Sequence, residues 1–159
     1  MKAPKVSEFM TKQPACVTPR TPVEQVARLM KEYDCGAIPI VGDDTFPIGI
    51  VTDRDIVIRA IALGKDPSSL TAGDIMTAPA STIVENASLD DCREALELAQ
   101  IRRIIVVDRS GRTTGIVSQA DLANHLKKKH AGEMLRAISK PEPKLRAATE
   151  AAADAVADR

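Results

Sequence analysis

Two short polar motifs contain the side chains best suited to bind a ligand. Each has a glycine, two apolar residues, a hydroxyl residue, two spacers and an aspartate, in Gly49-Ile50-Val51-Thr52-Asp53-Arg54-Asp55 and Gly115-Ile116-Val117-Ser118-Gln119-Ala120-Asp121. The pattern predicts a strand running into a helix, where exposed backbone N–H groups favour an anion. A hydroxyl there can donate to a phosphate oxygen, and a carboxylate one turn later can accept both hydroxyls of a ribose. The residue types therefore fit a nucleoside phosphate.

The same pattern also has a purely structural interpretation. Thr52-x-x-Asp55 and Ser118-x-x-Asp121 match a helix N-cap followed by an acidic first turn. The two roles are compatible, because a ligand can share or displace a cap. We favour binding because the complete motif occurs twice in matching surroundings. In addition, the glycine that opens each motif leaves space for a ligand ring to approach the backbone.

The motifs belong to a duplication. An offset of 66 residues relates them, and it also takes Met10-Thr11 to Met76-Thr77 and Val23-Glu24 to Leu89-Asp90. Self-similarity at a fixed period indicates a repeated structural unit. One such unit alone would bury only about 60% of its unfolded surface, so we expect the two to share one core. The expected divisions are repeat 1 at 6–63, a linker at 64–71, repeat 2 at 72–129 and a helical or partly disordered tail at 130–159.

A helix is expected in the first half of each repeat. Thr21-Pro22-Val23-Glu24 predicts a helix start with Thr21 as the N-cap. Gly36 is placed to end this helix in a left-handed conformation. The expected buried face comprises Val23, Val26, Leu29, Met30 and Tyr33 in repeat 1, and Leu89, Cys92, Leu96 and Ala99 in repeat 2.

Two apolar runs follow each helix and predict a hairpin, at 37–41 and 48–51, and at 104–107 and 115–117. Pro39 has no N–H for a strand ladder, so we expect edge or irregular pairing there. A second amphipathic helix should run from 53 to about 63, apolar at Ile56 and Ile61, and from 119 to about 129, apolar at Leu122 and Leu126. Short apolar strands between amphipathic helices predict an α/β fold with a helix-covered sheet.

Beyond repeat 2 the pattern changes. The run Lys127-Lys128-Lys129-His130 precedes an apolar segment at Met134, Leu135 and Ile138, and Pro141-Glu142-Pro143 separates that segment from an alanine-rich stretch at 145–157. The stretch has the composition of a helix, but its alanines bury little surface. We expect this stretch either to dock on a neighbour or to fray.

Charge and composition exclude several classes of protein. The chain has 22 basic and 22 acidic residues, so no global field attracts nucleic acid or an anionic membrane. The three cysteines have no CxxC spacing, and no apolar signal region follows the first residues, so we expect a reduced, cytoplasmic protein. No apolar run approaches the roughly 20 residues that cross a bilayer, so we expect no membrane span.

On these motifs the chain resembles a tandem cystathionine β-synthase (CBS) domain pair, also called a Bateman module. The resemblance covers about residues 6–126 and rests on Met10-Thr11, Met76-Thr77, the Gly36-Ala37-Ile38-Pro39-Ile40 strand and both glycine-to-aspartate motifs. It implies a mixed α/β (α+β) fold in which two β-α-β-β-α repeats pack as one pseudo-symmetric module. It also implies adenosine nucleotides in clefts between the repeats, as in small bacterial-type stress and signal proteins that consist of little else.

The resemblance also implies which residues hold the ligand. In one site, an adenine wall from repeat 1 faces a hydroxyl and a carboxylate of repeat 2: Ala15, Val17, Cys35, Gly36, Ala37 and Pro39 against Ser118 and Asp121. In the mirror site the wall comes from repeat 2: Ser81 to Ile83, Ile101, Arg102 and Ile104 against Thr52 and Asp55. The strand residues Ile50 and Ile116 border the two sites. Arg54, Arg102 and Arg103 are candidate phosphate partners, with solvated surface charge as the alternative.

The two repeats depart from each other at two of these positions. Repeat 2 has Ile105 where the family usually places the strand proline, and Ala120 where repeat 1 has Arg54. We therefore expect the two sites to differ in phosphate preference and affinity, with fewer than two tight sites per chain.

The function that follows is an adenine-nucleotide sensor rather than an enzyme. AMP, ADP, ATP and NAD are all candidate regulatory ligands, and the bound ligand would shift the population of conformations toward one that an effector protein recognises. We expect a homodimer formed through the apolar faces of the helices at 53–63 and 119–129. A ligand-independent interaction scaffold, in which the motifs are only helix caps, is the main alternative.

Three other functions are weaker. His125 and His130 are the only histidines, and no catalytic set or metal-binding spacing accompanies them. Cys16 and Cys35 with His130 could hold a metal across a dimer, although small buried cysteines are commoner. Nucleic-acid binding would have to use the basic residues from Lys127 to Arg146. It is disfavoured because two Phe, one Tyr and no Trp offer almost no surface for base stacking.

Overall fold

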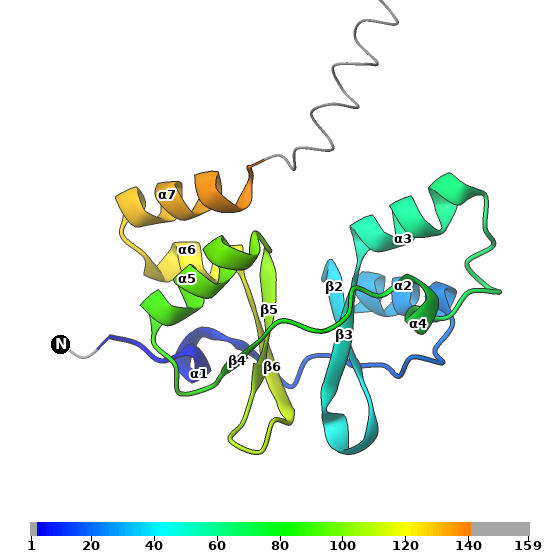
Figure 1. Cartoon of the computed structure of the whole chain (residues 1–159), viewed down its shortest axis with the longest axis horizontal. Helices are drawn as coiled ribbons and strands as arrows, with labels where there is room; N and C mark the ends of the chain where they lie inside the picture. The colour runs from blue at the N-terminus through cyan, green and yellow to red at the C-terminus, as the bar shows by residue number, and fades with distance from the viewer. Residues whose placement is uncertain (1–2, 141–159) are drawn as a thin grey trace, which may run out of the picture.

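Each predicted hairpin forms and is the centre of one of two lobes (Figure 1). The computed structural model describes residues 3–140. In repeat 1, β2 (Ala37–Val41) pairs antiparallel with β3 (Pro47–Thr52), and in repeat 2, β5 (Arg103–Val107) pairs antiparallel with β6 (Thr113–Ser118). Both hairpins have a register shift at the same place, Ile40/Val41 and Val106/Val107. The duplication in sequence is therefore also a duplication of backbone geometry.

Helices surround each hairpin in the predicted order. Before the hairpins lie α2 (Val23–Glu32) and α5 (Leu89–Ala99), and after them lie α3 (Asp53–Arg59) with the 3-10 turn η2 (Ile61–Leu63), and α6 (Gln119–His125). The repeats open with α1 (Val6–Phe9), β1 (Thr11–Lys12) and α4 (Ala72–Ile75), and the remaining elements are β4 (Thr82–Val84), the 3-10 turn η1 (Asp43–Thr45) and α7 (Lys128–Ile138). Repeat 2 has the predicted order β4-α5-β5-β6-α6, which confirms the mixed α/β class.

Pro39 explains why repeat 1 lacks a counterpart of β4. Its carbonyl accepts from the Val17 N–H at 3.1 Å, and the Val17 carbonyl accepts from Val41 at 2.8 Å. At the position equivalent to Pro39, the Ile105 N–H donates to the Ser81 carbonyl at 3.2 Å. Pro39 has no N–H for the corresponding bond, so pairing in repeat 1 is limited to a single bridge at Val17, whereas β4 pairs with β5 over three residues. The expected irregular pairing at Pro39 is confirmed.

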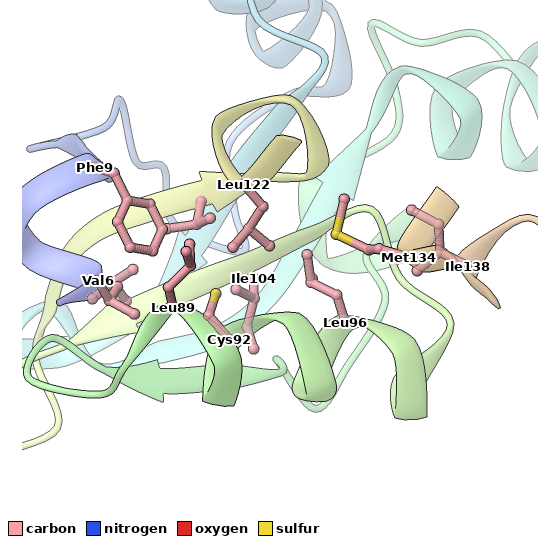
Figure 2. Packing of buried hydrophobic residues seen from close by; sticks show 11 residues of the cluster. Val6, Phe9, Leu89, Cys92, Leu96, Ile104, Leu122, Met134 and Ile138 are labelled. Atoms are coloured by element: carbon pink, nitrogen blue, oxygen red, sulfur yellow. The ribbon is translucent and has the colours of Figure 1, made fainter. Parts of the chain in front are cut away.

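The first helix of each repeat packs on the lobe of the other repeat (Figure 1). Thr11 of β1 pairs with Ile116 of β6, and Thr77 pairs with Ile50 of β3. Figure 2 shows Val6 and Phe9 of α1 among buried residues of repeat 2. The predicted shared core is therefore wrong: there are two clusters, and a segment from the other repeat completes each one. The first cluster contains Val6, Phe9, Leu89, Cys92, Leu96, Ile104, Leu122 and Met134, and the second contains Val23, Val26, Ile38, Ile40, Val51, Ala72 and Ile75.

This packing of the first segment of each repeat on the other repeat, called the exchange below, changes the interpretation of Gly49 and Gly115. A Cβ on Gly49 would lie 2.7 Å from the Thr77 carbonyl oxygen and 2.8 Å from the Met76 sulfur. A Cβ on Gly115 would lie 3.0 Å from the Thr11 carbonyl oxygen and would overlap the Met10 sulfur. The space in front of each glycine is filled by the exchanged Met-Thr segment, so it does not admit a ligand ring as predicted.

The ends of α2 differ from the prediction. The helix begins at Val23 with Pro22 at the N-cap and no side-chain cap, so the predicted Thr21 capping box is wrong. The reason is that Pro22 forms a bridge with Thr71 and the Thr21 carbonyl accepts from the Ala72 N–H at 2.7 Å, which holds this backbone extended. Asp34, with φ 49°, takes the left-handed conformation predicted for Gly36. The expected core residues Tyr33 and, in α5, Ala99 are exposed.

The last predicted helix of repeat 2 is two helices. α6 ends at His125, Leu126 is extended, and α7 folds back so that Met134 and Ile138 are buried against α5 and α6. The apolar segment of the tail therefore docks on its own chain. The lysine run lies at the N-terminus of α7 and not at the C-terminus of the helix predicted from 119 to about 129. The alanine-rich stretch lies outside the described residues. Within residues 3–140, none of the helices has the length and apolar character needed to cross a membrane.

Replacing Gly115 with alanine should destabilise the protein by about 1–3 kcal/mol, the usual cost of overpacking, because the added methyl group meets Met10 and the Thr11 backbone. Thermal unfolding followed by circular dichroism measures the effect. Gly132→Ala in α7 is the matched control, since nothing lies within 4 Å of its Cβ position. That substitution should stabilise the helix by about 0.5–1 kcal/mol. Equal melting temperatures for the two variants would contradict the proposed role of Gly115.

Candidate functional site

A cleft of about 530 Å³ lies between the two repeats. One side comes from repeat 1, in the segment that follows β1 and in the turn between α2 and β2. The other side comes from β5, β6 and the start of α6. The lining residues are Thr11, Lys12, Gln13, Pro14, Ala15, Tyr33, Asp34, Cys35, Gly36, Ala37, Ile38, Arg103, Ile116, Ser118 and Asp121.

Ser118 and Asp121 form a closed hydrogen-bonded unit on the repeat 2 side of the cleft. The N–H and the hydroxyl of Ser118 donate to Asp121 Oδ2 at 2.8 and 2.7 Å, and the Asp121 N–H donates to Ser118 Oγ at 3.2 Å. This is a capping box, so the structural interpretation of the motif is confirmed. It uses only one carboxylate oxygen: within residues 3–140, Asp121 Oδ1 has no hydrogen-bond or ion-pair partner. A half-buried carboxylate thus has one oxygen available in the cleft.

Arg103 brings a positive charge from repeat 2 to the backbone of repeat 1. A Cβ on Gly36 would lie 2.9 Å from Arg103 Nη2 and 3.1 Å from Asp53 Oδ2, so the guanidinium approaches because Gly36 has no side chain. Arg103 has no ion pair in the described part of the chain. Together with Lys12 it balances the carboxylates of Asp34 and Asp121 in the lining. The cleft therefore offers cations for an anionic group and an acceptor for hydroxyl groups.

The cleft brings together the core of one predicted site. The predicted residues that line it are Ala15, Cys35, Gly36, Ala37, Arg103, Ile116, Ser118 and Asp121. Two others of this set, Val17 and Pro39, do not line the cleft: they are buried where Val17 bridges β2. That these residues bind a ligand stays a prediction.

The residues of the predicted mirror site do not line this cleft. Ile83, Ile101 and Ile104 pack against the repeat 2 cluster. Arg54 and Arg102 are exposed, and Ile50 pairs with Thr77. Thr52 and Asp55 form the same capping box as in repeat 2, with Thr52 N–H and hydroxyl donating to Asp55 Oδ2 at 2.8 and 2.9 Å. However, Asp55 is buried, and its Oδ1 is 3.6 Å from Arg59 Nη2.

Sequence reasoning missed several lining residues, above all Lys12 and Asp34. Lys12 reaches the cleft because β1 crosses to β6, and nothing in the local sequence announces that crossing. Asp34 and Gln13 line the cleft from turns with φ 49° and 47°. Asp34 directly precedes Cys35-Gly36, so its position at the end of the predicted helix could have identified it as a lining residue.

The cysteines occupy different environments. Cys35 lines the cleft, whereas Cys92 is buried under α6 and its pKa is raised to about 12, first by burial and then by the charges of Asp121 and Asp91. Burial also raises the pKa of the Cys16 thiol, whose S–H donates to the Pro14 carbonyl at 3.3 Å. In the part of the chain from 3 to 140, no three His, Cys, Asp or Glu side chains gather as metal ligands.

Comparison with known proteins agrees with this architecture. Hypoxic response protein 1 of Mycobacterium tuberculosis is 37% identical over 134 residues, covering 84% of this chain and 93% of that protein. A crystal structure of Hypoxic Response Protein I with two coordinated zinc ions has a TM-score of 0.70 at 37% identity and covers 78% of this chain and 100% of that chain. The CBS domain pair of the protein MJ0100, in complex with 5′-methylthioadenosine and S-adenosyl-L-methionine, has a TM-score of 0.70 at 25% identity, with coverage of 77% and 95%.

The repeat itself is recognised directly. The model of the CBS domain matches residues 6–61 and again residues 72–128. These two matches take in the hairpins, both glycine-to-aspartate motifs and the residues on either side of the cleft. The chain therefore belongs to the CBS domain family and carries two copies of the domain in tandem.

Proposed function

We propose that this protein is a regulatory module that binds one adenosine nucleotide in the cleft between its two CBS repeats. The observation that carries the proposal is that one cleft combines Asp121, whose Oδ1 has no partner within residues 3–140, with the Arg103 guanidinium, which lies against the Gly36 backbone. The proposed role is binding rather than chemistry.

The cleft suggests how the nucleotide lies. The adenine would rest on the wall formed by Ala15, Cys35 and Ala37, where small side chains leave room for a flat ring. The ribose hydroxyls would donate to Asp121 Oδ1. The phosphate would then accept bonds from Arg103, with Lys12 nearby. Charge-assisted bonds of this kind are stronger than neutral ones, so we expect AMP, ADP or ATP to bind more tightly than adenosine.

Related proteins support the adenosine part of this proposal. The structure of the MJ0100 domain pair contains 5′-methylthioadenosine and S-adenosyl-L-methionine, two ligands that share the adenosine group. In the present cleft, Arg103 and Lys12 favour a ligand with negative charge. AMP, ADP, ATP and NAD are therefore the candidates we propose for this chain.

Signalling follows from the position of the ligand. The cleft is lined by both repeats, so a bound nucleotide contacts both lobes and stabilises the arrangement in which these contacts are best made. The shift is limited to the difference in affinity between the two arrangements. We propose that an effector protein recognises the arrangement that the ligand favours.

Asp121→Ala should abolish tight AMP binding, because it removes the acceptor for the ribose. Bonds to charged groups contribute about 1.5–3 kcal/mol, so the Kd should rise by about tenfold to a hundredfold. Isothermal titration calorimetry measures it.

Asp91→Ala is the matched control for the Asp121 variant. Ser88 and Asp91 form the same capping box at the start of α5, with Ser88 Oγ donating to Asp91 Oδ2 at 2.7 Å, but they do not line the cleft. Losing this cap should lower stability by about 0.5–2 kcal/mol without changing AMP affinity. If neither the wild type nor the control binds an adenine nucleotide, the motifs are only helix caps and the scaffold hypothesis replaces the present one.

We also propose a homodimer, formed through the exposed face of α3 and η2. Val57, Ile58, Ile61 and Leu63 are between 44% and 62% exposed there and form an apolar surface next to α2. The equivalent positions in repeat 2 are Ala123, Asn124, Lys127 and Lys129, and α7 already covers the apolar face of α6. We therefore narrow the predicted contact, which used both helices, to the α3 half, because within residues 3–140 this half carries the exposed apolar face. A two-fold axis through it would pair this surface with itself.

Ile58→Glu combined with Ile61→Glu should convert the dimer to a monomer of 17.0 kDa, because a buried charge without a partner is unfavourable. Light scattering at micromolar concentration measures the mass. Leu98→Glu is the control, since Leu98 is 86% exposed on α5, on the other lobe, and should leave the dimer intact. A monomeric wild type, or dissociation by the Leu98 variant alone, would contradict this interface.

A further inference from the structure

We propose that Arg59 blocks the second nucleotide position of this protein by occupying the carboxylate that would hold the ribose. The inference rests on the proposed function, and it adds a specific side chain that makes the two repeats unequal. It concerns Asp55, the repeat 1 equivalent of Asp121.

The contacts of Arg59 fix its guanidinium against Asp55. Arg59 Nη2 is 3.6 Å from Asp55 Oδ1, the oxygen that the capping box with Thr52 leaves unused. Arg59 Nη1 donates to the Ile75 carbonyl at 2.7 Å, at the end of α4. The Asp55 side chain is only 12% exposed, whereas that of Arg59 is 44% exposed. Solvent therefore reaches the guanidinium much more than the carboxylate. The guanidinium therefore lies over the oxygen that a ribose would need.

Repeat 2 lacks this arrangement at the same positions. The residue equivalent to Arg59 is His125, and the residue equivalent to Ile75 is Phe9. His125 Nδ1 is 2.8 Å from the Asp121 backbone oxygen, not from its carboxylate, and the imidazole packs on the Phe9 ring with centroids 5.3 Å apart. Two contacts thus hold the histidine away from Asp121 Oδ1, which stays available to the cleft.

The two residues differ in what a ligand must displace. At Asp55 a ribose would have to displace the cation that pairs with a mostly buried carboxylate, and removing one partner of such a pair leaves the other charge uncompensated. The displaced guanidinium would also lose its bond to the Ile75 carbonyl. At Asp121 a ribose displaces only water from an unused oxygen. The proposed difference in affinity follows from what the ribose must displace at each aspartate. It does not depend on the capping boxes, which are the same in both repeats.

Calorimetry with AMP on the full chain tests the inference. We expect the wild type to bind one AMP per chain, Asp121→Ala to bind none tightly, and Asp121→Ala with Arg59→His to regain one site. Arg59→His places in repeat 1 the residue that repeat 2 has, and Arg59→Gln is a second variant that removes the charge. Adding Asp55→Ala should remove the regained site. Arg28→Ala is the control for loss of an exposed arginine, since Arg28 pairs with Glu24 on α2 and lies outside the cleft.

The outcomes separate the two proposals. Two equal sites in the wild type overturn the role of Arg59 and leave nucleotide binding intact. If the wild type has one site that depends on Asp121, and neither folded Arg59 variant gains a second site, the role of Arg59 is also overturned while nucleotide binding stands. Absence of AMP binding in the wild type and in both Arg59 variants removes the proposed function and this inference together. Circular dichroism melts identify any variant that fails to fold.

Discussion

The packing of each Met-Thr segment on a strand of the other repeat is the constraint on which this structure depends. Met10 and Thr11 lie against Gly115 of β6, and Met76 and Thr77 lie against Gly49 of β3, so closely that a Cβ on either glycine would crowd these neighbours. This contact places α1 in the repeat 2 core and α4 in the repeat 1 core. It also determines the course of the segment after β1, which forms one wall of the cleft. Without the exchange, the repeats would be two marginal units with no site between them.

The exchange is symmetric, but single residues make the halves unequal. Pro39 removes one ladder bond that Ile105 supplies, so only repeat 2 has β4. Gly36 admits the Arg103 guanidinium, whereas Arg102 stands at the equivalent position in repeat 2. In the described part of the chain, α7 covers the repeat 2 helices, whereas the α3 face is exposed. Between residues 3 and 140, the duplicated framework therefore carries a cleft with an unpaired carboxylate oxygen on repeat 2 and an exposed apolar face on repeat 1.

The features predicted correctly from the sequence are those specified by neighbouring residues. The hairpins follow from apolar runs around a turn, and the capping boxes from a hydroxyl residue and an aspartate three positions apart. The exchange could not be predicted in this way, because both glycine-bearing strands present the same local pattern to both Met-Thr segments. Thr21 shows the consequence: its sequence suits an N-cap, but its backbone pairs with α4 instead. The Asp55–Arg59 contact has the spacing of a helical ion pair and was open to prediction from the sequence.

The most direct test of the account is the difference electron density of crystals grown with AMP. The account predicts one nucleotide per chain between the repeats, with its adenine beside Cys35 and Ala37, its ribose on Asp121, its phosphate toward Arg103, and no nucleotide at Asp55. Density at Thr52 and Asp55 alone, or an empty cleft in protein saturated with AMP, would contradict it.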